Sequence, residues 1–270
     1  MRVRETSVKS ASNLKSAMNP IISRIRTDLK SNADAVTQKS FQRFFKEGVK
    51  CYGVKTGIVG KIAAKYWKDI EPFDKKEIFK LCEELYRSDY CEEAFIVSWW
   101  VPKLTDKFEL KDLILFKKWI EKYINNWAKC DGFCNHTIGN FIEKYPQSIK
   151  QIKEWTKSKN RAFGDAFGTS AVEDRWLKRA AAVSLIVPAK RGKFLKDAFE
   201  IADRLLLDTD DMVQKGYGWL LKEASRLHQK EVFKYVMKHK ALMPRTALRY
   251  AIELMPKSLK AQAMAVKKCG

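Results

Sequence analysis

A tryptophan and an aspartate lie four residues apart in the segment from Asn126 to Gly132, which reads NWAKCDG. In a helix, residues at this spacing share one face, so the indole of Trp127 and the carboxylate of Asp131 would be neighbours. An aromatic ring face and a carboxylate both attract positive charge. We therefore hypothesise that Asp131 acts on a cationic reaction centre beside Trp127.

Two later segments carry side chains that would complete such a site: WLKR, which ends at Arg179, and QKGYGW, which ends at Trp219. The indole of Trp219 would present a second ring face to the cation. The planar guanidinium of Arg179 suits the oxygens of a nearby phosphate. We expect these residues to surround Asp131.

Simpler interpretations of the same residues stay open. Both tryptophans could be ordinary core residues at helical spacing. Asp131 could cap a helix that begins near Gly132, because an aspartate at that position accepts hydrogen bonds from free backbone N–H groups. Arg179 could be a solvated residue or an ion-pair partner of Glu173 or Asp174.

The charge balance indicates a polyanionic partner. The chain has 270 residues, with 53 Lys and Arg against 32 Asp and Glu, and a formal net charge of +21. Hydrophobic residues make up 46% of it, which is enough to form a substantial core. An excess of positive charge on this scale favours nucleic acid as the partner. A carboxylate is an unusual group to place on such a surface, which singles out Asp131.

Metal sites and membrane segments are not indicated. The six cysteines lack the paired close spacings of a structural zinc site, and Cys130, Cys134 and His136 have no fourth ligand nearby. We expect no metal and no cofactor. No apolar run reaches membrane-spanning length, and the first residues lack the apolar core of a signal peptide. We expect a soluble, cytoplasmic protein, associated with the nucleoid in a prokaryote.

Hydrophobic periodicity predicts an all-α protein. From Pro20 onward, apolar residues recur at helical spacing in stretches of roughly 10 to 18 residues separated by short polar breaks, and strand-like alternation is essentially absent. Such a run predicts stacked antiparallel helix pairs, compatible with HEAT-like repeats of roughly 35 to 45 residues. Stacked pairs curve, so we expect a C-shaped solenoid whose basic concave face follows a duplex.

Two stretches stand apart from this pattern. The polar residues 1–17 predict a loose leader, or a helix that forms against something else, before a single domain at 18–270. Residues 158–174 contain two glycines and predict a long loop or insertion within that domain. Three acids, Asp208, Asp210 and Asp211, precede an expected helix from 212. Asp210 or Asp211 would make a good N-cap there, which explains the acids better than a Mg²⁺ site.

Several motifs resemble one protein family in order and spacing. They lie between Phe41 and Leu254 and read YGVK at 52–55, LYRS at 85–88 followed by Glu92 and Glu93, NWAKCD at 126–131, WLKRAA at 176–181, VQKGYGWLLKE at 213–223 and MPRTALRY at 243–250. On these motifs the chain is similar to the HEAT-like-repeat alkylpurine DNA glycosylases, the AlkD-type DNA alkylation repair enzymes.

The resemblance implies a C-shaped helical repeat protein that excises cationic N3- and N7-alkylated purines from duplex DNA. It assigns the catalytic carboxylate to Asp131, the flanking aromatics to Trp127 and Trp219, and an active-site arginine to Arg179. Such enzymes are described as working without extruding the base, in contrast to most glycosylases. The 158–174 stretch looks longer than the family usually has at this place.

Partners and chemistry follow from this. We expect a monomer with no obligate protein partner, contacting duplex DNA through Lys55, Lys178, Lys215, Arg245 and Arg249.

A cationic purine leaves as a neutral base, so no strong general acid is required. As the bond stretches, a carboxylate stabilises the oxocarbenium-like sugar and water is the nucleophile. The alternative functions are a non-catalytic HEAT-repeat protein that binds damaged or branched DNA, and a protein-binding scaffold.

Overall fold

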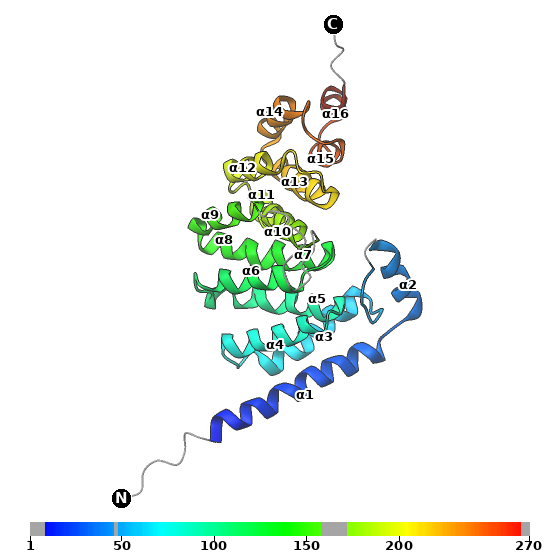
Figure 1. Cartoon of the computed structure of the whole chain (residues 1–270), viewed down its shortest axis with the longest axis vertical. Helices are drawn as coiled ribbons and strands as arrows, with labels where there is room; N and C mark the ends of the chain where they lie inside the picture. Colours follow the sequence, from blue (N-terminus) through cyan, green and yellow to red (C-terminus); the bar gives the residue numbers. More distant parts are fainter. Residues whose placement is uncertain (1–8, 46–47, 158–171, 266–270) are drawn as a thin grey trace, which may run out of the picture. The chain divides into compact units, whose positions relative to one another are not determined.

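The computed structural model describes residues 9–45, 48–157 and 172–265 of the chain, and every regular element within these ranges is a helix (Figure 1). The all-α prediction is confirmed. By their internal contacts the residues form two compact units, Met1–Lys107 and Phe108–Gly270. The expected single domain from 18 to 270, its repeat character and its curvature stay predictions.

The described residues of the first unit form five α-helices and one 3-10 helix. Their bounds are α1 Lys9–Ser31, α2 Ala35–Phe44, α3 Thr56–Ile70, α4 Lys75–Arg87, α5 Cys91–Trp100 and η1 Val101–Lys107. Helix α5 packs against both α3 and α4, and the indole N–H of Trp100 donates to the carbonyl of Ala63 at 2.8 Å. Helix α1 begins at Lys9, so the second half of the segment expected as a leader is helical, and residues 1–8 lie outside the described part.

A buried carboxylate fixes the turn that leads into α3. The side chain of Glu92 is fully buried and accepts hydrogen bonds from the backbone N–H groups of Tyr52, Gly53 and Val54 at 2.8–3.0 Å. Gly53 has φ of 89°, and a Cβ there would lie 2.6 Å from the carbonyl oxygen of Asp34. Only glycine fits this turn, because a side chain would be strained and would also collide with backbone.

The second unit holds the residues expected to do chemistry. Its α-helices are α6 Asp112–Tyr123, α7 Trp127–Phe133, α8 Gly139–Lys144, α9 Ile149–Glu154, α10 Val172–Val183, α11 Ile186–Lys190, α12 Leu195–Leu205, α13 Asp211–Ala224, α14 Gln229–His239, α15 Arg245–Ala251 and α16 Lys257–Met264. The short elements are the π-helix η2 Cys134–Ile138 and the 3-10 helices η3 Pro146–Ser148 and η4 Trp155–Lys157. The expected loop at 158–174 falls mostly outside the described residues, and its last three residues open α10.

Helix α10 occupies the centre of this unit. It packs against α6 and α7 on one side and against α13 on the other, and α13 in turn packs against α15 (Figure 1). An aromatic cluster supports α6 and α7, in which the rings of Phe116, Phe133 and Phe141 meet edge to face at 5.7–5.9 Å. The two helices that carry Asp131 and Arg179 are therefore set on a common core.

Candidate active site

Asp131 lies inside a helix rather than at its start. Asn126 is the N-cap of α7, and its side-chain oxygen accepts a hydrogen bond from the backbone N–H of Lys129 at 3.0 Å. Trp127 is the first residue of α7, so Asp131 follows one turn later on the same face. The N-cap interpretation of Asp131 is wrong, because the cap lies five residues earlier.

Asp131 and Arg179 form a bidentate ion pair between α7 and α10. The guanidinium Nε donates to Oδ1 of Asp131 and Nη2 donates to Oδ2, both at 2.8 Å. The side chain of Arg179 is 6% exposed, and that of Asp131 is 14% exposed. This fork-to-fork geometry is among the strongest hydrogen-bonded pairings in proteins, and burial removes most of the competition from water.

The third nitrogen of Arg179 is also engaged within the protein. Its Nη1 donates to the backbone carbonyl of Met212, near the start of α13, at 2.6 Å. Gly216, one turn further on, provides room, because a Cβ at that position would lie 3.4 Å from Cγ of Arg179. Each of the three guanidinium nitrogens therefore has an acceptor within the protein, which supports an intramolecular role for Arg179. The expected phosphate contact of Arg179 stays a prediction.

Burial and pairing act in opposite directions on the carboxylate. Burial raises the pKa of the Asp131 carboxyl above its ordinary value, and the charge and hydrogen bonds of Arg179 offset part of that rise. Burial is the largest single influence on the pKa of Arg179 and lowers it, but the charge of Asp131 and its hydrogen bonds with the guanidinium act together with smaller contributions to raise it. Arg179 therefore stays protonated and is the group that favours the ionised form of Asp131.

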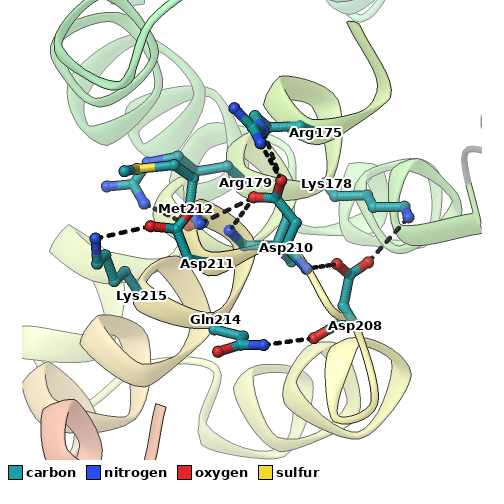
Figure 2. A network of polar contacts seen from close by, with 10 residues as sticks. Arg175, Lys178, Arg179, Asp208, Asp210, Asp211, Met212, Gln214 and Lys215 are labelled. Carbon is teal, nitrogen blue, oxygen red and sulfur yellow. Dashed lines mark hydrogen bonds and ion pairs between the residues drawn. The ribbon is translucent and has the colours of Figure 1, made fainter. Parts of the chain in front are cut away.

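Three more cations are paired with the acids at the start of α13 (Figure 2). The pairs are Arg175 with Asp210 at 2.5 Å, Lys178 with Asp208 at 2.9 Å and Lys215 with Asp211 at 3.1 Å. Oδ1 of Asp210 accepts from the backbone N–H groups of Met212 and Val213 at 2.9 and 3.2 Å, so the predicted N-cap is confirmed. Lys178 and Lys215, expected to contact DNA, are engaged with carboxylates.

The two tryptophans are half-buried, and neither belongs to the fully buried core. Trp219 lies on α13, three residues after Gly216, so helical spacing puts it near the face that receives Arg179. Its indole N–H donates to the carboxylate of Glu223 at 3.3 Å. Helical spacing therefore puts Trp127 on the face of α7 that carries Asp131 and Trp219 near the face of α13 that receives Arg179.

The remaining cations expected to contact DNA are exposed. Arg245 and Arg249 lie on α15, where Arg245 donates to the carbonyl of Met264 at 3.4 Å. Helix α15 packs closely on α13, since a Cβ at Gly218 would lie 2.8 Å from the carbonyl oxygen of Ala247. Lys55 is the N-cap residue of α3 in the first unit.

The helix that carries Asp131 continues past Cys134 through η2 into α8. A π-turn of this kind is often found at functional sites. Cys130 and Cys134 are buried thiols, and Cys130 donates to the carbonyl of Trp176 at 3.6 Å. In the described ranges, no group of three or more His, Cys, Asp or Glu side chains is arranged to hold a metal ion.

Sequence reasoning missed two parts of the site. The carbonyl of Met212 carries no signal in the sequence, because any residue could supply it. The acids Asp208, Asp210 and Asp211 were interpreted as capping residues, and their pairing with Arg175 and the two lysines was not predicted. Basic residues at a three- to four-residue spacing in α10 were the available signal, since residues at 175, 178 and 179 share a face.

No helix in the described part of the chain combines the length and apolarity needed to cross a membrane. A family model described as DNA alkylation repair enzyme matches residues 25–164 and 168–255. No curated protein matches the chain.

Two solved structures share the fold. A protein described as a predicted DNA alkylation repair enzyme from Enterococcus faecalis has a TM-score of 0.69 and 14% identity, covering 84% of this chain and 98% of its own. A protein from Streptococcus mutans UA159 has a TM-score of 0.51 and 20% identity, covering 77% of this chain and 98% of its own.

Proposed function

The chain belongs to the DNA alkylation repair enzyme family, and on that premise we propose that it hydrolyses the N-glycosidic bond of purines alkylated at N3 or N7 in duplex DNA and leaves an abasic site. The observation that supports this most directly is the Asp131–Arg179 pair. For binding DNA alone, a buried carboxylate held in one orientation offers no advantage. A hydrolase with a cationic transition state gains a fixed negative charge.

The carboxylate has acceptor capacity left for the reaction. Arg179 occupies one position on each oxygen of Asp131, and an ionised carboxylate offers about four. The remaining positions suit a water molecule and the positive edge of the sugar. Burial raises the pKa of Asp131, and Arg179 opposes that rise and so favours the ionised form. The proposal requires this ionised form, with its negative charge in place before the bond begins to stretch.

The reaction follows from the charge of the lesion. Alkylation at N7 or N3 makes the purine a cation, so cleavage of the bond between C1′ and the purine nitrogen sends its electron pair to the base, which leaves neutral. Positive charge then develops on the sugar, where Asp131 stabilises it. Water adds to C1′ and releases one proton, which Asp131 accepts. Removing the electrostatic contribution would cost about a hundredfold in rate or more.

The half-buried tryptophans would hold the cationic nucleotide. Each ring face is worth about 0.5–2 kcal/mol when it is desolvated against a cation. Because Trp127 and Trp219 are only half-buried, we extend the proposal to recognition without extrusion of the base. Phosphate contacts fall to the exposed cations, namely Arg245, Arg249 and Lys55.

Release of 7-methylguanine and 3-methyladenine from methylated duplex DNA tests the proposal. We expect release by the wild-type protein and a loss of about a hundredfold or more in Asp131→Asn, with DNA binding retained. Asp69→Asn is the control, because it removes a carboxylate from an exposed ion pair with Arg24. Tight binding by all three proteins without release of base would support the non-catalytic DNA-binding alternative instead.

A further inference from the structure

Helix α10 holds the first turn of α13 at two points that lie one turn apart. At the first point, Arg175 donates from Nε and Nη2 to Oδ2 of Asp210 at 2.6 and 2.5 Å. At the second point, Arg179 donates to the carbonyl of Met212 at 2.6 Å (Figure 2). Both cations come from the same face of α10, so they fix both the position and the direction of the helix start.

Asp210 joins these two points. Its Oδ2 receives Arg175, while its Oδ1 accepts from the backbone N–H groups of Met212 and Val213 at 2.9 and 3.2 Å. Because the N–H and the carbonyl of Met212 belong to one residue with two soft torsions, anchoring the N–H limits where the carbonyl can lie. That carbonyl is the acceptor for Nη1 of Arg179.

The segment before the cap is held from the same helix. Lys178 is paired with Asp208 at 2.9 Å, and Oδ1 of Asp208 accepts from the backbone N–H of Asp210 at 2.9 Å. Gln214 donates to the carbonyl of Asp208 at 2.9 Å. The four side chains of these two pairs, Arg175, Lys178, Asp208 and Asp210, are 12–24% exposed. The pairs are therefore partly buried, and we expect them to contribute more to stability than ion pairs on the open surface.

We propose that Asp210, held by Arg175, is a positioning residue for the reaction: it sets the start of α13 so that the carbonyl of Met212 turns the guanidinium of Arg179 onto Asp131. This inference rests on the proposed glycosylase function for its kinetic consequence. The orientation of Arg179 does not depend on that function and is measured separately.

Ordinary helix capping makes a different prediction for one substitution. Asparagine caps a helix about as well as aspartate, so Asp210→Asn keeps the cap but loses the charge that holds Arg175. A capping role alone predicts wild-type behaviour for Asp210→Asn. The positioning role predicts that Asp210→Asn and Arg175→Met each reduce the single-turnover rate about tenfold, with KM unchanged because the two side chains are engaged with each other within the protein. Arg175→Lys keeps the charge and is expected to retain most of the rate.

The pH profile gives a second readout that loss of packing would not move. Burial raises the pKa of Asp131 and Arg179 opposes the rise, so a less well oriented Arg179 lets the pKa rise further. Activity requires the ionised carboxylate and is lost as the pH falls through that pKa. The acid limb of the rate profile therefore shifts to higher pH in Asp210→Asn and Arg175→Met, and an unshifted limb would count against the positioning role.

The direct test is solvent exchange of the Arg179 Nε–H proton, followed by NMR on the full chain. The signal is assigned by its loss in Arg179→Lys. We expect exchange at least tenfold faster in Asp210→Asn than in the wild type, and no change in Asp74→Asn, which alters the N-cap of α4 in the same way. Unchanged exchange in Asp210→Asn would overturn the inference. Release of base by the wild type decides the glycosylase function independently, since the exchange measurement needs no substrate.

Discussion

Replacing Arg179 by methionine would leave the carboxylate of Asp131 buried without its partner. Side-chain exposures of 6% and 14% put this pair among buried ion pairs, for which removal of one partner costs about 3–5 kcal/mol, rather than among surface pairs worth about 1 kcal/mol or less. Loss of the hydrogen bond to the carbonyl of Met212 adds about 1 kcal/mol. We expect Arg179→Met to lower the free energy of unfolding by about 5 kcal/mol at pH 8.

The stability lost in Arg179→Met depends on pH. Burial already raises the pKa of Asp131, and without Arg179 it rises further. For an acid whose pKa is higher in the folded than in the unfolded state, the favourable contribution is complete below the unfolded pKa and is lost as the pH rises through the folded one. The deficit of Arg179→Met is therefore larger at pH 8 than at pH 5, because the unpaired carboxyl takes up a proton more readily as the pH falls.

Urea unfolding of four proteins measures the effect: wild type, Arg179→Met, Asp131→Asn and the double variant, each at pH 8 and pH 5. The double variant buries two neutral side chains and no unpaired charge, so it should recover at least about 2 kcal/mol relative to Arg179→Met at pH 8. Additive losses in the double variant, or an equal deficit at both pH values, would refute a buried, mutually dependent pair.

Three other substitutions test features that support the site. Gly53→Ala should destabilise the first unit by about 2 kcal/mol or more in thermal unfolding, because it adds strain at positive φ and a collision with the carbonyl of Asp34. Gly218→Ala should cost about 1–3 kcal/mol in urea unfolding, since its Cβ meets the carbonyl of Ala247. Glu92→Gln should cost about 2 kcal/mol and speed amide exchange in the turn it holds, because one amide cannot accept from three N–H groups as a carboxylate does.

A matched control exists for both glycine substitutions. Gly57 lies near the start of α3, and a Cβ there would meet nothing within 4 Å. Gly57→Ala should therefore raise the free energy of unfolding by about 0.5 kcal/mol through helix propensity and a less flexible unfolded chain. Equal losses in Gly57→Ala and Gly218→Ala would mean that close packing of α13 on α15 is not the reason for the glycine at 218.

The helices were predictable because their signals are local. Apolar residues recur at helical spacing between Asp74 and Tyr86, where α4 is observed, and Asp74 caps this helix with Glu77 in a capping box. A proline usually ends a helix, yet Pro188 lies at the third position of α11. Its missing N–H interrupts no intrahelical hydrogen bond there, because the first N–H groups of a helix have no intrahelical acceptor.

The site was predictable in its residues but not in its pairings. Asp131 and Arg179 were expected near one another from the resemblance, while charge alone offered Glu173, Asp174 or a phosphate as the partner of Arg179. The observed partner is 48 residues away, and no local pattern identifies a contact at that separation. The same limit applies to Lys178, because its carboxylate partner Asp208 comes after α12 in the sequence.

Charge is balanced within the site although the whole chain is strongly basic. Four cations and four carboxylates pair there: Arg175, Lys178, Arg179 and Lys215 with Asp210, Asp208, Asp131 and Asp211. The net charge of +21 therefore lies on other residues. Counterion release makes their attraction to DNA fall steeply with ionic strength, whereas partly buried pairs are screened far less. The affinity for DNA therefore varies strongly with salt, while the electric field at the carboxylate of Asp131 varies far less. In an active site with unpaired basic residues, both properties would change together.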